Sequence, residues 1–296
     1  MSGELILQLL FTGITVGCIY GLVAIGFNII YNATGIINFA QGEFVMLGGM
    51  CAVWLHGDVG LPMFVTFPAA VLIVTGVGIL LERLIIRPVK NPNVLSMIII
   101  TIGASIFIKG AVMIIGGKQT FPLPHFSSEE PIRIGGAAIL PQDLWVLGIT
   151  AAIVVGLGLF FERTLTGKAI RACAFNRRAA SLVGINVSWM VLLSFALSAA
   201  VGAAAGVAVT PITLISYDRG TMLALKGFSA AVLGGLGNST GAVVAGFVIG
   251  ILESLSAGSP LSHYKDAVAL VVLMGVLFVR PSGLFGGAEA GRLKKF

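Results

Sequence analysis

Six long stretches of the chain contain no Asp, Glu, Lys or Arg, and this feature restricts the possible folds more than any other. A helix needs about 20 predominantly apolar residues to cross the hydrocarbon core of a bilayer. Several of the uncharged stretches reach that length, and the first and fifth are long enough for two segments, or for one segment and a broken one. They are residues 5–42, 59–81, 91–108, 144–161, 179–217 and 227–252. The pattern predicts a polytopic integral membrane protein.

The composition favours helices over a membrane β-barrel. Apolar residues make up 57% of the 296 residues and charged residues only 10%, whereas soluble domains contain about 25% charged residues. Barrel strands alternate polar and apolar residues over about 10 positions, but these stretches are continuously apolar. We therefore predict an all-α helical bundle that forms a single transmembrane domain over residues 1–296.

We expect about eight membrane segments, with a range of about seven to nine. A shorter, Gly-rich apolar piece at 222–237 is predicted to be a broken or re-entrant helix, and the parity of the crossings favours one that crosses. The other segments are predicted at 5–31, 36–56, 61–86, 94–116, 143–161, 188–214, 239–256 and 265–280.

The basic residues gather in three short stretches, which the positive-inside rule places in the cytoplasm. The formal net charge of +6 therefore reflects membrane topology, and nucleic acid is not an expected partner. The loop 117–142 has few basic residues and suits the outer side. The three groups are Arg83, Arg87 and Lys90; Arg163, Lys168, Arg171, Arg177 and Arg178; and Arg280, Arg292, Lys294 and Lys295.

Motifs for covalent chemistry are absent from the sequence. Gly167-Lys168 is followed by Ala169, so no phosphate-binding P-loop is present. The three histidines lack metal-ligand spacing, and the three cysteines are scattered, which indicates neither a disulfide framework nor a metal site. We expect no catalytic activity, no metal and no cofactor in this chain.

Several polar side chains fall within or beside the predicted membrane segments. A charge at the bilayer centre costs at least about 2.5–3.5 kcal/mol, so such residues are candidates for function. For Glu43, a role in a translocation pathway or gate competes with a structural hydrogen-bonding role. The candidates for a translocation pathway are Asn28, Tyr31, Asn38, Gln41, Glu43, Lys226 and Glu253.

Residues 163–187 are too polar to cross the membrane and are predicted to form a cytoplasmic segment with a short helix against the membrane face. Small Ala residues alternate there with basic side chains. This alternation suits either contact with anionic lipid or docking into the groove of a partner protein.

Four sequence blocks resemble a known family. GLVAIGFNIIYNATGIINFAQGEFVMLGG, GKAIRACAFNRRAASLVGINV, ALKGFSAAVLGGLGNSTGA and YKDAVALVVLMGVLFVRPSGLFG follow one another along most of the chain. They are similar to the inner-membrane permease subunit of branched-chain amino acid ABC importers, specifically the H-type of its two permeases.

The resemblance implies a multi-pass protein of the bacterial inner membrane that imports leucine, isoleucine, valine or related small solutes. Its implied partners are a second, paralogous permease, two ATPase subunits that bind ATP and Mg²⁺, and a periplasmic solute-binding protein. The segment between Gly167 and Gly184 would then couple to an ATPase. The coupling candidates are Gly167, Lys168, Arg171, Ala172, Arg177 and Gly184.

Alternatives remain at this point. The same family includes permeases for urea and short amides. From the residues alone, an autonomous proton-coupled transporter with Glu43 or Glu253 as proton carrier, or a passive channel, is also consistent with the sequence. The motifs do not distinguish a homodimeric from a heterodimeric pore.

Overall fold

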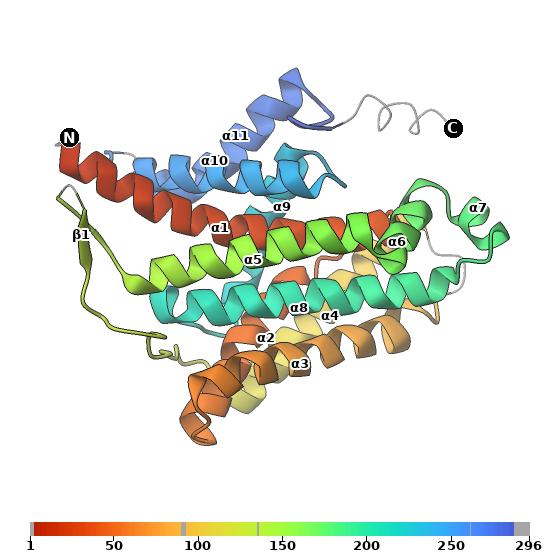
Figure 1. The fold of residues 1–296 in the computed structure, drawn as a ribbon, viewed down its shortest axis with the longest axis horizontal. Helices are drawn as coiled ribbons and strands as arrows, with labels where there is room; N and C mark the ends of the chain where they lie inside the picture. The colour runs from red at the N-terminus through yellow and green to blue at the C-terminus, as the bar shows by residue number, and fades with distance from the viewer. Residues whose placement is uncertain (1–2, 90–92, 135, 261, 287–296) are drawn as a thin grey trace.

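The computed structural model describes residues 3–89, 93–134, 136–260 and 262–286, and the fold is almost entirely helical (Figure 1). A two-stranded antiparallel hairpin, β1 (Ile132–Ile134) with β2 (Ala137–Ile139), lies between α4 and α5. The helices are α1 (Gly3–Thr34), α2 (Gln41–Val53), α3 (Met63–Leu81), α4 (Val94–Gly116), α5 (Pro141–Arg163), α6 (Leu165–Phe175), α7 (Arg177–Leu182), α8 (Val187–Thr213), α9 (Arg219–Gly234), α10 (Ser239–Ala257) and α11 (Lys265–Val279), with π-helical turns η1 (Trp54–Asp58) and η2 (Glu82–Ile86) and a 3₁₀ turn η3 (Ser262–Tyr264).

Seven helical stretches of the described chain are long and apolar enough to cross a membrane. Two further helices, α2 and α9, contain only 13 and 16 residues. Helix α9 is about 24 Å long at 1.5 Å per residue, shorter than the hydrocarbon core of about 30 Å. Helix α2 continues without a break into η1, so its helical stretch runs on to Asp58. The predicted polytopic all-α bundle is confirmed, and its two short helices become the centre of interest.

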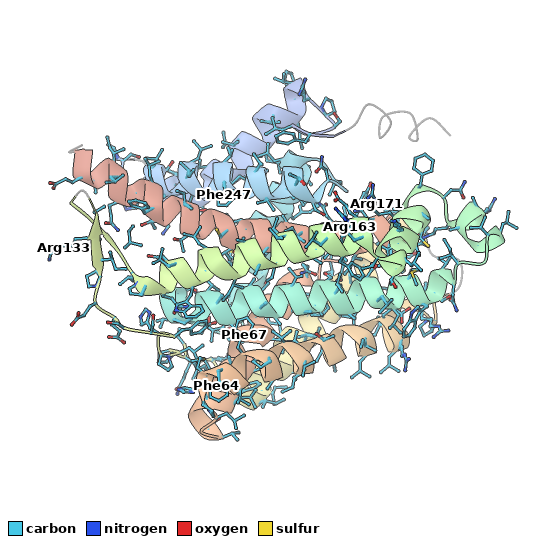
Figure 2. All side chains as sticks on the ribbon, in the orientation of Figure 1. Phe64, Phe67, Arg133, Arg163, Arg171 and Phe247 are labelled. Atoms are coloured by element: carbon cyan, nitrogen blue, oxygen red, sulfur yellow. The ribbon has the colours of Figure 1, made fainter. Side chains whose placement is uncertain are left out.

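The membrane segments run between two ends of the bundle, which are chemically different. We call one the hairpin end, because it carries β1 and β2 together with the start of α1 (Figure 1). The other, the basic end, carries α6 and α7, and Figure 2 shows Arg163 and Arg171 there, far from Arg133 on β1. Arg87 and Arg177 line the same cavity, so the first two basic groups lie at one end of the bundle. Lys90, Arg292, Lys294 and Lys295 fall outside the described residues.

Helix α9 differs in detail from the prediction for 222–237, because it is one continuous helix. The chain is interrupted before it, at 214–218, where Ile215 pairs with Phe121 through two backbone hydrogen bonds of 2.8 and 3.0 Å. Helix α9 then runs to the basic end, where Asn32 of α1 donates a hydrogen bond to the Gly237 carbonyl (3.0 Å). Helix α9 alone is shorter than a membrane span, so the extra crossing that the parity argument required stays a prediction.

Small residues bring α1 and α10 into very close contact. A methyl group on Gly17 would lie 2.7 Å from the Phe247 Cα, and one on Gly250 would lie 2.4 Å from the Gly17 amide nitrogen. Helices in a bilayer gain little by moving apolar side chains out of lipid, so close backbone packing of this kind holds them together. The glycines recur at four-residue spacing, Gly13, Gly17 and Gly21 on α1 and Gly246 and Gly250 on α10, which places them on one face of each helix.

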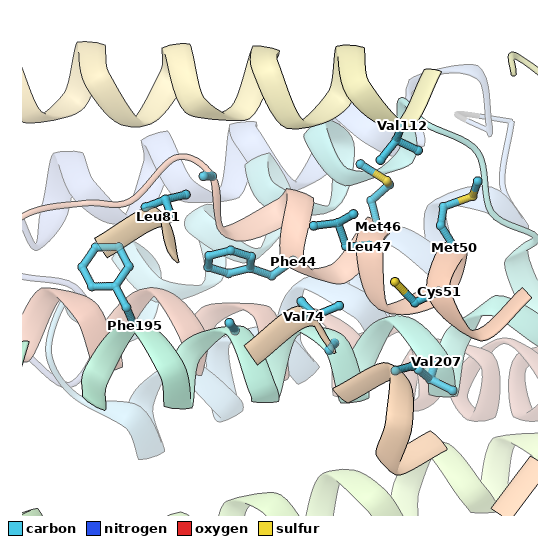
Figure 3. Close-up of a cluster of buried hydrophobic side chains, with 14 of the residues drawn as sticks. Phe44, Met46, Leu47, Met50, Cys51, Val74, Leu81, Val112, Phe195 and Val207 are labelled. Atoms are coloured by element: carbon cyan, nitrogen blue, oxygen red, sulfur yellow. The ribbon is translucent and has the colours of Figure 1, made fainter. Parts of the chain in front are cut away.

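Helices α1 and α8 are the most buried long helices, and α2 packs against α8. A methyl group on Gly206 would clash with the Val45 carbonyl, which shows how near the two backbones are. Around this contact Phe44, Phe195 and Leu81 gather with other apolar side chains (Figure 3). By contrast, α5 and α11 expose large apolar faces, as expected of helices that contact lipid.

Candidate functional site

The two short helices α2 and α9 begin side by side. A methyl group on Gly42 would lie 2.1 Å from the Gly220 carbonyl oxygen, and one on Gly220 would lie 2.6 Å from the Gly42 carbonyl oxygen. Only glycine allows this approach. Each helix start has unpaired N–H groups and the positive end of the helix dipole, so two positive helix ends meet inside the bundle.

Glu43 lies at this junction. Its side chain is buried, and its Oε1 accepts a hydrogen bond from the Ser105 hydroxyl of α4 (2.9 Å). By geometry its Oε2 makes no hydrogen bond within the described residues, although Gly220 is adjacent and both the Thr221 hydroxyl and Lys109 interact with the carboxylate. Buried polar atoms are nearly always hydrogen-bonded, and an exception calls for an explanation. A buried carboxylate oxygen without a hydrogen bond, beside the starts of two helices, keeps Glu43 as a candidate for the predicted translocation pathway.

Gln41 has a clear structural role beside it. Its Oε1 accepts a hydrogen bond from the Ser198 hydroxyl (2.5 Å), and its Nε2 donates to the Ser198 carbonyl (3.3 Å). Gly26 and Gly202 leave room for the amide. Gln41 therefore fixes the start of α2 against α1 and α8.

Asn38 belongs to the loop that precedes α2. Its Oδ1 accepts a hydrogen bond from the Ala40 N–H (3.1 Å), while its buried Nδ2 has no partner. The structure thus places Asn38, Gln41 and Glu43 along the entry to one short helix, with an unpaired polar atom at either end of the row.

Asn28 and Tyr31 contact a different part of the fold. Asn28 accepts a hydrogen bond from the Gly237 N–H (3.0 Å) and donates one to the Asn238 carbonyl (3.1 Å). The half-buried Tyr31 ring lies against Gly237. Both residues therefore pack on the turn between α9 and α10, and their expected place in a pathway stays a prediction.

Lys226 and Glu253 lie together at a third place in the bundle. The Lys226 ammonium lies 2.6 Å from a Glu253 carboxylate oxygen and 2.6 Å from one of Asp266, and the Tyr20 hydroxyl donates to Glu253 (2.8 Å). Burying a charge is costly unless it is paired and hydrogen-bonded. This cluster joins α9, α10, α11 and α1. Each charge in it has a partner of opposite sign, which indicates a structural role.

We expect Lys226→Met to destabilise the protein by about 3 kcal/mol, because it leaves the partly buried Glu253 carboxylate without its cation. Thermal unfolding of the purified protein in mild detergent measures this loss. Lys226→Arg serves as the control that retains the charge, and Lys226→Met combined with Glu253→Gln should recover part of the stability. Equal melting temperatures for Lys226→Met and wild type would contradict a structural role.

Among the described residues, no group of three or more His, Cys, Asp or Glu is placed to hold a metal ion. The site around Glu43 is a junction of polar contacts between helices.

Comparison with known proteins now identifies the family. A family model described as the permease component of the branched-chain amino acid transport system matches residues 9–277. The chain belongs to this permease family. It is 35% identical to the high-affinity branched-chain amino acid transport system permease protein LivH of Escherichia coli K12, over 97% of both chains. It is 34% identical to the corresponding protein BraD of Pseudomonas aeruginosa, over 97% of this chain and 98% of the relative.

Among solved structures, the chain is similar to PsaBC from Streptococcus pneumoniae in complex with Fab. The TM-score is 0.51 at 15% sequence identity, with 98% of this chain and 95% of that chain covered. This likeness concerns the fold alone. Family membership and the seven apolar helices make the chain a multi-pass membrane permease component.

In this permease the segment predicted to be cytoplasmic forms α6 and α7 at the basic end. Gly167 is required by packing, because a methyl group there would lie 2.2 Å from the Phe160 carbonyl oxygen. Gly184 ends α7 with a φ of 88°, a conformation that favours glycine. Thr164 and Asn176 cap the two helices by accepting hydrogen bonds from Gly167 and Ala179. The sequence thus specifies two short, well-defined helices.

The outer surface of α6 and α7 is both basic and apolar. Lys168 and Arg171 are exposed, and Ala172 is half-buried. Large apolar side chains are exposed beside them: Phe175, Leu182 and Val183 are 80%, 87% and 76% exposed. Arg177 is also exposed, but its guanidinium donates two hydrogen bonds to the Ala33 carbonyl (3.1 and 2.7 Å). It therefore connects α7 to the end of α1.

Several residues at these sites were not singled out from the sequence. Ser105 and Ser198 are isolated hydroxyls in apolar helices, and nothing in their neighbours marks them. Tyr20 and Asp266 meet Lys226 and Glu253 only through tertiary packing. Glu82 could have been singled out from its charge, because a carboxylate at the end of a predicted membrane segment is a candidate for function. It is buried within η2, at the end of α3.

Proposed function

We propose that this chain is a permease subunit of an ATP-driven importer in the bacterial inner membrane, and that it moves branched-chain amino acids or related small solutes into the cytoplasm. The observation that carries the proposal is the family match over residues 9–277. The relatives named for high-affinity branched-chain amino acid transport, matched along nearly their whole length, support the substrate class.

In this proposal the pathway passes Glu43. The residue lies where two short helices begin, beside the half-buried Ser105 and near the exposed Thr221 of α9. In transporters, substrate sites are commonly built from helices that are interrupted within the membrane, with helix N-termini directed at the site. A second, paralogous permease would line the rest of the pathway beside Glu43.

The α6–α7 segment supports coupling to an ATPase subunit. Its exposed apolar side chains next to Lys168 and Arg171 have the mixed apolar and Arg-rich composition of protein interfaces. Movement of this segment would reach the membrane part directly, because Arg177 holds the end of α1. ATP and Mg²⁺ would bind on the ATPase subunits.

Reconstitution tests the proposal. The chain is co-expressed and co-purified with a candidate paralogous permease and candidate ATPase subunits from the same organism. The complex is placed in liposomes with a solute-binding protein outside and ATP inside. We expect uptake of radiolabelled leucine against its gradient, none without ATP or binding protein, and none by the chain alone.

Each alternative predicts a different result. ATP-dependent uptake of urea but not leucine would identify a urea or short-amide permease. Uptake by the chain alone under a pH gradient would indicate a secondary transporter. Uptake that follows the concentration gradient and ignores ATP would indicate a channel, and either of the last two results would overturn the proposal.

A further inference from the structure

A cavity of about 250 Å³ lies at the basic end, separate from the Glu43 junction. It is enclosed by the end of α1, the loop before α2, the π-helical turn η2 and the first turns of α4 and α8. Pockets for drug-sized ligands measure about 300–1,000 Å³, so this cavity suits a smaller molecule. Single π-helical turns within α-helices are frequent at functional sites.

Two polar side chains that line the cavity are buried and have unsatisfied atoms. Asn38 is fully buried, and its Nδ2 donor has no partner. Glu82 is 2% exposed, and its Oε2 acceptor has no partner. Leaving a buried polar atom unpaired costs about 1–3 kcal/mol, and more for a charged group. A ligand that supplies one acceptor and one donor would remove both penalties.

The remaining lining provides positive charge and an apolar surface. Arg87 and Arg177 both line the cavity, and Arg177 has donors beyond those bound to Ala33. Another part of the lining is apolar and buried. It is formed by Ile30, Ile86, Met97 and Phe195.

We propose that this cavity binds one apolar α-amino acid as a zwitterion. The ammonium group would contact Glu82, the carboxylate would contact Asn38 Nδ2 and the Arg177 guanidinium, and the aliphatic side chain would lie against the apolar surface. The assignment of an amino acid rests on the proposed function. The buried Glu82 carboxylate interacts electrostatically with Arg87 and Arg83, yet one of its oxygens has no hydrogen bond among the described residues. That observation does not depend on the proposed function, and it favours a ligand with an ammonium group over a simple anion.

The first test uses the wild-type complex in detergent and photo-leucine, an analogue that cross-links on illumination. We expect labelling of peptides that line the cavity, within 30–38, 82–89 or 187–195. Excess leucine should suppress this labelling. 4-Methylpentanoate, which lacks the ammonium group, and isopentylamine, which lacks the carboxylate, should compete at least about tenfold less well, because each leaves one buried group unpaired.

The second test uses variants. Glu82→Gln removes the partner of the ammonium group without changing the side-chain volume, and should reduce labelling of the cavity peptides at least about tenfold. Glu162→Gln is the matched control, because Glu162 is an exposed carboxylate near the same end and does not line this cavity. Its labelling should equal that of wild type.

The results that would contradict this inference differ from the results that would contradict the proposed function. The inference is wrong if cavity peptides are not labelled, if 4-methylpentanoate or phosphatidylglycerol competes as well as leucine, or if Glu82→Gln labels normally. Competition by phosphatidylglycerol would identify an anionic headgroup site. Each of these results is compatible with ATP-dependent leucine uptake. If Glu82→Gln does not fold, the analogue competition on the wild-type complex still decides.

Discussion

Glu43→Gln should lower ATP-dependent uptake at least about tenfold while leaving the assembled complex intact. The amide has nearly the same volume and can still accept the Ser105 hydrogen bond. It removes the negative charge and the acceptor at Oε2, which by geometry makes no hydrogen bond within the described residues. A charge-assisted hydrogen bond contributes about 1.5–3 kcal/mol, and about 1.4 kcal/mol corresponds to a factor of ten. Initial uptake rates in proteoliposomes measure the effect.

The assembly state decides between the two roles that the sequence left open for Glu43. Size-exclusion chromatography of the Glu43→Gln complex should match wild type, and Glu162→Gln, an exposed carboxylate at the end of α5, should transport normally. Normal uptake by Glu43→Gln would remove the residue from the pathway. Dissociation of the complex would instead give Glu43 a structural role.

The membrane architecture could be predicted because it depends on properties of short stretches of sequence. Uncharged runs marked the helices, and the basic clusters around Arg163 and Arg171 marked one end of the bundle. The family was recognised in the same way, from four blocks of contiguous residues, and the family match confirmed it.

Contacts between distant segments could not be predicted in this way. Asn28 was grouped with Glu43 as a pathway candidate, and nothing in the sequence indicated that its amide also hydrogen-bonds to the turn between α9 and α10, about 210 residues away. Likewise, Lys226 has partners 27 and 40 residues away along the chain. Helical spacing predicts which side chains share a face, but not which segment will pack on that face.

Arg177 illustrates the same limit within the predicted coupling segment. The sequence grouped it with Lys168 and Arg171 as one basic surface. The structure separates them, because the Ala33 carbonyl at the end of α1 binds the Arg177 guanidinium. Carbonyl groups at a helix end lack partners within the helix, so a nearby Arg can donate hydrogen bonds to them.

The exposed Arg171 is therefore the better residue for testing coupling. We expect Arg171→Glu to weaken association with the ATPase subunits at least about tenfold, because a reversed charge at a complementary interface costs several kcal/mol. Its side chain makes no hydrogen bond or ion pair within the described chain, so folding of the permease should be unaffected. Co-purification in mild detergent and stimulation of ATP hydrolysis by loaded binding protein are the two measurements.

Arg133→Glu is the matched control, since Arg133 is also exposed but lies on β1 at the hairpin end. It makes the same change in net charge and should leave ATPase association unchanged. If both variants weaken association equally, the effect is one of overall charge and not of a contact at α6. If neither variant weakens association, Arg171 does not contact the ATPase. The apolar Phe175 and Leu182, exposed on the same two short helices, then become the residues to test. Loss confined to Arg171→Glu would place the ATPase on the surface that Arg177 joins to α1, the shortest route from the partner subunit to the membrane helices.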